Sequence, residues 1–161
     1  MTALAIRPPH TQEDWEWVTA LWREEWGGEV MVTRGQLYRL SDLQALVAWD
    51  GGDRVGLATY LLHGDSCELM SLNALTGRKG VGTALLAAVE EVARQHHCRR
   101  LWLITSNDNL DALRFYQRRG YRLTAVHVGA IDQARALKPT IPLIGHHGIP
   151  IRDELELAKE L

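Results

Sequence analysis

The segment from residue 67 to residue 106 constrains the fold more than any other part of the chain. A β-prone run, "CELMSLNAL", comes first, and a glycine-rich loop joins it to a run of helix formers, "GTALLAAVEEVARQHH", at residues 82–97. A second apolar run, "RRLWLITS", then suits a buried central strand. Because strand and helix patterns alternate here, the segment predicts a mixed α/β domain.

The patterns on either side extend this order. They predict strands at residues 3–9, at 44–62 as a hairpin around "DGGD", and at 121–131. They predict helices at residues 11–26, where Thr11 and Asp14 suit a capping box, and at 109–119. Residues 27–35 are ambiguous, residues 36–43 indicate a short helix, and residues 132–150, with three of the five prolines, indicate a long loop. The last segment, 151–161, fits a closing strand or a terminal helix, and we expect a single domain over residues 1–161.

Composition excludes several kinds of partner. The 161 residues carry a formal net charge of −2, so we expect no basic surface for nucleic acid or for an anionic membrane. The two cysteines, Cys67 and Cys98, form no disulfide framework. The N-terminal segment has no long apolar run, which predicts neither a signal peptide nor a membrane span and favours a cytoplasmic protein.

The glycines of the loop "LTGRKGVG" indicate a site for an anion. Backbone N–H groups of residues 77–83 can point inward at the start of the next helix, whose dipole adds positive partial charge. Arg78 and Lys79 add charge at the rim. A tight turn with solvated basic residues is the alternative. Spacing excludes a P-loop, because no lysine follows Gly82, and a dinucleotide fingerprint, because Leu85 stands where glycine or alanine is required.

A second informative stretch, "NDNLDALRFYQRRGY", follows at residues 107–121. Asn109 stands at a helix start, where its amide can cap the helix or bind a ligand, and Tyr116 lies two turns later on roughly the same face. The loop "GRKGVGTALL", a short strand and then "NLDALRFYQRRGY" together resemble the GNAT family of acyl-CoA-dependent N-acetyltransferases. The resemblance implies an α/β fold with a mixed, mostly antiparallel sheet of about seven strands flanked by about four helices.

The resemblance also implies acetyl-CoA as co-substrate and matches residues to it. The family's pyrophosphate loop corresponds to Gly80, Val81, Gly82 and Thr83. The end of its fourth strand, whose open backbone groups bind the pantetheine arm, corresponds to Leu72, Asn73 and Ala74. Asn109 and Ala112 correspond to the cofactor-facing side of the next helix. One position departs from the family: Gly77 stands where arginine or glutamine is usual, and a shifted loop would let Arg78, beside Lys79, substitute for it.

The implied reaction is direct transfer of the acetyl group to a primary amine of a small molecule or peptide. Tyr116 corresponds to the tyrosine beside the thioester sulfur, where it would protonate the leaving thiolate; the alternative is a core aromatic beside Phe115. An N–H group within residues 72–74 would hold the carbonyl oxygen. Glu68 is the candidate general base, on a strand where some family members carry a carboxylate, and a solvent-facing glutamate is the alternative.

The acceptor side of the site is less constrained by sequence. His63 and His127 are candidates for proton relay or for ordinary packed or surface histidines. Two segments are candidate walls: "EEWGGE" with Trp26, and the loop at residues 132–150 with Arg135, Lys138, His146 and His147, whose charges either read an anionic acceptor or are simply solvated. No carboxylate or cysteine has ligand spacing to the two histidines, so no metal is predicted. A non-catalytic acyl-CoA sensor or interaction module is the alternative function, and the resemblance is compatible with a homodimer.

Overall fold

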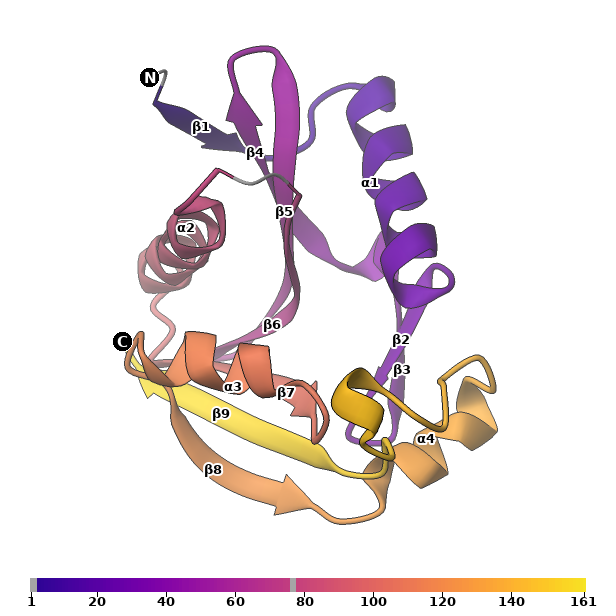
Figure 1. Ribbon diagram of the computed structural model, residues 1–161. Coiled ribbons are helices and arrows are strands. Elements are labelled where there is room, and N and C mark those ends of the chain that lie inside the picture. Colours follow the sequence, from indigo (N-terminus) through magenta and orange to yellow (C-terminus); the bar gives the residue numbers. More distant parts are fainter. Residues whose placement is uncertain (1–2, 76–77) are drawn as a thin grey trace.

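A seven-stranded sheet forms the centre of the computed structural model, which describes residues 3–75 and 78–161 (Figure 1). Within these residues its spatial order is β1 (Leu4–Arg7), β4 (Gln44–Asp50), β5 (Asp53–His63), β6 (Ser66–Ala74), β7 (Arg100–Ser106), β9 (Glu154–Glu160) and β8 (Arg122–His127). Among the described pairs, β6 and β7 run parallel and the others antiparallel. The described helices are α1 (Gln12–Trp26), α2 (Val81–Gln95), α3 (Leu110–Gln117) and α4 (Ala130–Leu137). The predicted fold class is therefore confirmed.

The sheet separates two apolar clusters. On one face, Leu85 and Val89 of α2 pack with Leu101 of β7, and α3 adds Tyr116 to the same cluster. On the other face, α1 contributes a separate cluster that includes the fully buried Trp22. Helices α1 and α2 each bury residues spaced three or four apart, the spacing that places side chains on one helical face. No helix in the described part of the chain is both long and apolar enough to cross a lipid bilayer.

The first helix begins with the predicted capping box. The N–H group of Asp14 donates to the hydroxyl of Thr11 at 3.0 Å, and the N–H group of Thr11 donates to the Asp14 carboxylate at 3.1 Å. Arg54 of β5 also donates to Asp14, at 2.8 Å. The N–H group of His10, Arg54 and the N–H group of Thr11 together hold the pKa of Asp14 below its ordinary value. These contacts fix the start of α1 against the sheet.

Residues 30–39 form a hairpin, where the sequence left residues 27–35 ambiguous and indicated a short helix at residues 36–43. β2 (Val30–Thr33) pairs with β3 (Gln36–Arg39), and only Leu40–Asp42 forms a short 3-10 turn, so the helix predicted at residues 36–43 is wrong. Arg34 and Gly35 have φ angles of 51° and 75°, the left-handed geometry that two-residue hairpin turns require. The pairing across this turn therefore outweighs the local helical pattern.

The segment predicted as a long loop at residues 132–150 contains most of α4. That helix begins after Gly129, whose φ is 74°, and buries Ile131 and Ala134, so the loop prediction is wrong in its first part. The strand predicted at residues 121–131 ends at His127 for the same reason. Beyond α4 the chain forms a 3-10 turn at His146–Gly148 and an isolated bridge between Ile144 and Pro150. The last segment is strand β9, which decides between the two alternatives for residues 151–161.

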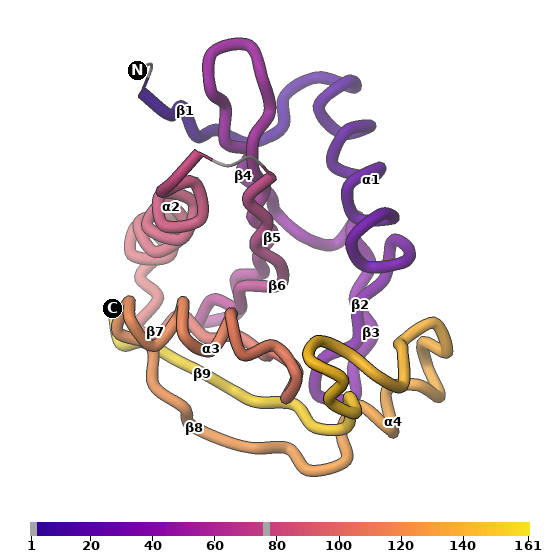
Figure 2. Tube along the Cα trace, viewed as in Figure 1, coloured from indigo at the N-terminus to yellow at the C-terminus, as the bar shows by residue number. Residues whose placement is uncertain are grey.

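Strands β6 and β7 pair over only part of their length. Their register runs from Ser66 opposite Arg100 to Leu69 opposite Leu103, and no described residue of β6 beyond Leu69 pairs on this edge. A bulge relative to β5 leaves Met70 as an extra residue at the same point, which bends the strand. From there β6 leads toward the start of α2, while β7 runs below α3 (Figure 2). The end of β6 therefore offers an open backbone edge beside the helices.

Candidate functional site

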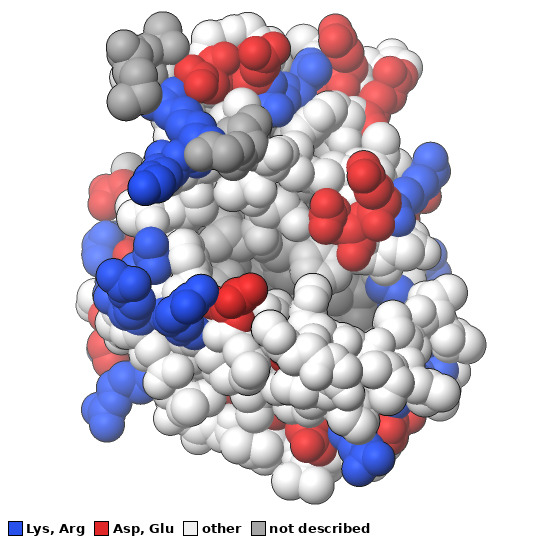
Figure 3. Space-filling model, in the orientation of Figure 1, with Lys and Arg blue, Asp and Glu red and all other residues white. Residues whose placement is uncertain are grey.

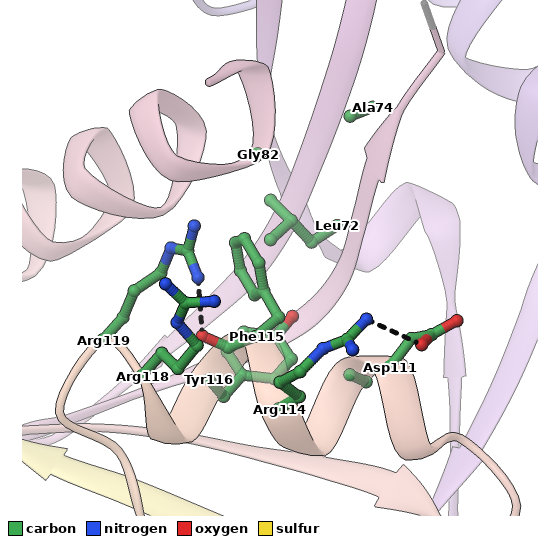
Figure 4. A pocket seen from close by; sticks show the side chains of 10 residues that line it. Leu72, Ala74, Gly82, Asp111, Arg114, Phe115, Tyr116, Arg118 and Arg119 are labelled. Atoms are coloured by element: carbon green, nitrogen blue, oxygen red, sulfur yellow. Dashed lines mark hydrogen bonds and ion pairs between the residues drawn. The ribbon is translucent and has the colours of Figure 1, made fainter. Parts of the chain in front are cut away.

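Two cavities meet at the open edge of β6. The first, of about 480 Å³, lies between the end of β6, the start of α2 and the upper face of α3, and we call it the α3 cavity (Figure 4). The second, of about 640 Å³, is bounded by the end of α1, β2, the ends of β6 and β7, and α4, and we call it the α4 cavity. Leu72 lines both. The space-filling view shows this face hollowed at its centre, with basic side chains gathered on the α2 and α3 side (Figure 3).

The start of α2 presents free backbone amides beside the α3 cavity. Gly80 precedes the helix with a φ of 92°, a conformation that favours glycine. The first intrahelical bond runs from the N–H group of Ala84 to the carbonyl of Gly80, so the N–H groups of Val81, Gly82 and Thr83 have no acceptor within the helix. These N–H groups lie at the positive end of the helix dipole, and such a helix start suits an anion.

Arg119 completes the cation side of this cavity, although sequence reasoning missed it. Its guanidinium stacks over the Phe115 ring at 3.7 Å and donates to the Thr83 hydroxyl at 3.0 and 2.8 Å. Arg114 and Arg118 also line the cavity, so three arginines of one helix segment surround it (Figure 4). The signal in the sequence was "RFYQRRG", where one arginine lies two residues before the tyrosine and two lie two and three residues after it. The positive charge expected from the glycine loop is thus supplied largely by α3.

The loop before α2 is only partly described. Arg78 forms an ion pair with Asp50 at 2.7 Å, which directs its guanidinium toward the β4–β5 turn, and Lys79 is exposed. Gly77, at the position that departs from the family pattern, lies outside the described residues. Gly82 lines the α3 cavity, and a Cβ added to it would lie 3.4 Å from the Phe115 ring. A Cβ at residue 82 would thus touch the ring, and a larger side chain would extend into the cavity.

The end of β6 contributes to both cavities. Leu72 and Ala74 line the α3 cavity, while Leu72 and Asn73 line the α4 cavity. The side-chain oxygen of Asn73 is buried and has no hydrogen-bond partner among the described residues. Asn109 caps α3: its side-chain oxygen accepts a hydrogen bond from the N–H group of Ala112 at 3.1 Å. Of the two predicted roles, helix capping and ligand binding, this oxygen therefore has the first. Ala112 itself lines the α3 cavity.

Tyr116 lies in the floor of the α3 cavity and belongs to the core at the same time. It is 8% exposed and makes edge-to-face contacts with Phe115 at 5.1 Å and with Tyr121 at 5.6 Å. Burial raises the pKa of its phenol above the ordinary value of 10.0, so the hydroxyl is protonated at neutral pH, as it is in a free tyrosine. No described residue forms a hydrogen bond with that hydroxyl. The two alternatives for Tyr116, core aromatic and site residue, are therefore compatible.

Glu68 is buried, which contradicts the solvent-facing alternative for this residue. Its side chain accepts a hydrogen bond from the hydroxyl of Thr33 at 3.0 Å, and the residue is 4% exposed. Burial raises the pKa of its carboxyl to about 7, with smaller contributions from Glu154 and Glu156, while Thr33 and Arg34 act in the opposite direction. Glu68 is not among the described residues that line either cavity, but Thr33 lines the α4 cavity. The hydroxyl of Thr33 thus connects the carboxyl with that cavity.

The two expected acceptor walls both border the α4 cavity. Trp26 lines it from the end of α1, and Lys138, Ile141 and His146 line it from the segment after α4. Arg135 takes no part, because its guanidinium donates to the carbonyls of residues 141, 142 and 151 and holds that segment together.

The positions of His127 and His63 fit the alternative of a packed and a surface histidine. His127 bonds the carboxylate of Glu156 at 3.2 Å, on the side of the sheet covered by the β2–β3 hairpin, while His63 ends β5 in an exposed position. Among the described residues, no three His, Cys, Asp or Glu side chains are grouped so as to hold a metal ion.

A family model for the acetyltransferase (GNAT) family matches residues 11–121. The chain belongs to this family. It is also 44% identical over 154 residues to the uncharacterized protein YxbD of Bacillus subtilis, covering 95% of this chain and 97% of YxbD.

Solved structures of GNAT acetyltransferases have the same fold. A Bacillus subtilis acetyltransferase in complex with CoA matches with a TM-score of 0.73 and 20% identity, covering 99% of both chains. A GNAT acetyltransferase from Elizabethkingia anophelis with acetyl-CoA bound also has a TM-score of 0.73, with 19% identity over 98% of both chains. GNAT homologues of this chain thus bind CoA or acetyl-CoA.

Proposed function

We propose that this GNAT protein transfers an acetyl group from acetyl-CoA to a primary amine, with Tyr116 as the general acid. One observation carries the proposal: the wall of the α3 cavity combines a buried, protonated tyrosine, the free amides of a helix N-terminus and the open edge of β6. The family match supports the donor, because GNAT acetyltransferases of the same fold have been solved with acetyl-CoA.

The residues around the α3 cavity fit a CoA-type donor. In this proposal the amides of Gly80, Val81, Gly82 and Thr83 and the guanidinium of Arg119 hold the pyrophosphate, because a helix N-terminus and an arginine both favour phosphate oxygens. Leu72, Asn73 and Ala74 hold the pantetheine arm along the open edge of β6. The small side chain of Ala112 leaves room for that arm. Lys79 contributes charge at the rim, whereas Asp50 pairs with the guanidinium of Arg78.

The reaction requires three functions of the protein: stabilisation of the carbonyl oxygen, protonation of the sulfur and removal of a proton from the amine. Acetyl-CoA supplies an acetyl group activated as a thioester. An N–H group at the end of β6 donates to the thioester carbonyl oxygen and stabilises the charge that develops there. Tyr116 gives its phenolic proton to the sulfur as the carbon–sulfur bond breaks and the carbon–nitrogen bond forms. The phenoxide regains a proton from solvent when the product leaves.

Glu68 is the proposed acceptor of the proton that the amine loses. Its pKa of about 7 lies close to neutral pH, where a general base is most effective. The hydroxyl of Thr33 donates to this carboxyl and lines the α4 cavity, so it can pass a proton from the cavity to Glu68. In this scheme the amine enters through the α4 cavity and meets the donor at Leu72.

Thiol release from acetyl-CoA over a panel of amines tests the proposal directly. Mass spectrometry of the products should find an addition of one acetyl group on nitrogen in every reaction that releases thiol. Binding of CoA measured by calorimetry, without thiol release across small amines, amino acids and peptides, would contradict the enzyme proposal and favour an acyl-CoA sensor on the same fold.

A further inference from the structure

The walls of the α4 cavity contain more carboxylates than cations. Among its described lining residues, Glu25, Asp108 and Glu154 are acidic, whereas Lys138 and His146 are the basic or titratable counterparts. Figure 3 shows acidic side chains gathered near the end of α1, beside the hollow. The cavity thus favours a positively charged occupant, if its own cation is engaged elsewhere.

The cation in this wall is indeed engaged with backbone carbonyls. The ammonium of Lys138 donates to the carbonyl of Trp26 at 2.6 Å and to that of Val30 at 2.8 Å, which joins α4 to the end of α1 and to β2. Burial lowers the pKa of this lysine. Lys138 therefore has a structural role and does not neutralise the carboxylates across the cavity.

Asp108 is also accounted for by the fold. Its carboxylate accepts a hydrogen bond from the Ser106 hydroxyl and another from the N–H group of His146 at 2.9 Å. Gly145 packs so closely against it that a Cβ there would overlap the carboxylate. This aspartate holds the segment after α4 against the end of β7, and its charge is compensated by those donors.

Glu154 differs from Lys138 and Asp108, because the fold does not compensate its charge in the same way. It is 3% exposed and lines the cavity, and its two carboxylate oxygens share one donor, the N–H group of Arg34, at 3.2 and 3.4 Å. It forms no ion pair with any described residue, although its strand neighbour Glu156 bonds Arg100 at 3.0 Å. Burial raises the pKa of Glu154, against the opposite effects of Arg34 and His127, and a cationic ligand at this carboxylate would offset the cost of its burial.

Unpaired polar atoms in the same walls also indicate a polar ligand. The side-chain oxygen of Asn73 and the indole N–H group of Trp26 are buried without a hydrogen-bond partner among the described residues, and both residues line this cavity. Buried polar atoms of folded proteins are nearly always bonded. The residues of these walls therefore include polar atoms that the described part of the chain leaves without a partner.

Glu154 lies across the cavity from the position where transfer occurs. In the sheet it pairs with Ser106 of β7, three residues beyond Leu103, and Leu72 is three residues beyond Leu69, the partner of Leu103. Beyond Leu69 strand β6 no longer pairs with β7, so the strand order alone relates the two residues: β7 lies between the strand of Leu72 and the strand of Glu154. Two strand spacings place their backbones at least about 10 Å apart. One amine cannot occupy both ends of this gap.

We propose that the acceptor is a small dibasic amine, whose distal ammonium pairs with Glu154 while its neutral amine meets the thioester beside Leu72. This inference rests on the proposed function and names the substrate class of the same site. An acceptor with a carboxylate at the distal end is disfavoured, because it would face Glu154 directly. The reacting amine gives up its proton to Glu68 by way of Thr33, and the distal ammonium pairs with Glu154, which the N–H group of the adjacent Arg34 holds, so the two nitrogens have separate carboxylates.

The test compares hexamethylenediamine with n-hexylamine and with N-acetylhexamethylenediamine, which keeps the chain but lacks the distal charge. We expect the wild-type kcat/KM for the diamine to exceed that for either monobasic amine by about tenfold or more. Glu154→Gln should reduce this ratio to near one, while Glu160→Gln, an exposed change on the same strand, should preserve it. Calorimetry of hexamethylenediamine on the CoA-saturated protein measures the same preference without turnover.

The outcomes separate the two proposals. Equal use of all three amines by the wild-type protein, or no binding of the diamine, would overturn the dibasic acceptor, and acetylation of the monobasic amines would leave the transferase proposal standing. Diamine binding that depends on Glu154, without thiol release, would overturn the transferase proposal and support the charge assignment. If Glu154→Gln does not fold, the comparison of the diamine with its N-acetyl derivative on the wild-type protein decides.

Discussion

Arg119 donates two hydrogen bonds to the hydroxyl of Thr83 and thereby joins the end of α3 to the first turn of α2. The same guanidinium stacks on Phe115 and donates to the Phe115 carbonyl at 2.8 Å, so it is held in one orientation over the cavity. A guanidinium fixed in this way loses little conformational freedom when it meets a phosphate. The relationship between these two residues thus prepares a cation beside the free amides of α2.

Arg119→Gln should weaken CoA binding by about tenfold, because it removes the fixed positive charge but keeps a hydrogen-bonding side chain. Calorimetric titration with CoA measures the change. Arg122→Gln, an exposed substitution at the start of β8, is the matched control and should leave the Kd of CoA unaltered. Equal Kd values in the two variants would remove Arg119 from the phosphate site.

Tyr116→Phe should lower kcat by roughly 100-fold or more and leave CoA affinity nearly unchanged, since the ring packing is kept and only the proton donor is lost. Steady-state thiol release and calorimetry give the two quantities separately. Tyr121→Phe serves as the control, because its hydroxyl bonds Glu90 at 3.2 Å and its ring makes an edge-to-face contact with Tyr116. A normal kcat in Tyr116→Phe would exclude the tyrosine as general acid.

Gly82→Val should raise the Kd of CoA about tenfold or more, because the added side chain would enter the α3 cavity against the Phe115 ring. The thermal midpoint of unfolding, measured in parallel, separates this effect from a loss of folding. Gly52→Ala, at a β-turn glycine with open space around it, is the control. Unchanged CoA affinity in Gly82→Val would contradict the placement of the pyrophosphate at the start of α2.

Glu68→Gln should reduce the dependence of stability on pH. The folded carboxyl has a pKa of about 7 and the ordinary value is 4.5, so wild-type protein loses unfolding free energy as pH rises between these values. The loss is on the order of 3 kcal/mol. Urea unfolding from about pH 5 to about pH 8 checks it, with the exposed Glu24→Gln as control. If the wild type and Glu68→Gln respond to pH in parallel, the raised pKa of Glu68 is contradicted.

Sequence patterns predicted the central part of the fold because its signals are local. Helix α2 has an apolar face at regular spacing and a glycine start, and α3 has an Asn109 cap and ends before Gly120, which has the expected left-handed φ of 92°. The β2–β3 hairpin and α4 were missed because non-local contacts decide them. Arg34 of the hairpin bonds Glu154, far along the chain, and Lys138 after α4 bonds the end of α1.

The residues of the candidate site divide in the same way, into those with a local sequence signal and those placed by non-local contacts. Tyr116 and the start of α2 could be predicted from one continuous stretch and its spacing. Glu154 could not, because its burial depends on a hairpin that lies more than a hundred residues earlier in the chain. Nor does the alternating pattern of "ELELAKE" reveal which of its charged residues faces a cavity.

Leu72 is the one lining residue common to the two cavities among those described, and the other walls divide along the chain. The α3 cavity is built from residues 72–119, whereas the α4 cavity draws on residues 25–33 and 131–154 for most of its outer walls. The outer segments can therefore change in sequence, and with them the choice of amine, while the middle of the chain keeps the same donor. In the proposed function, the middle of the chain thus binds the donor and the two flanking segments select the acceptor.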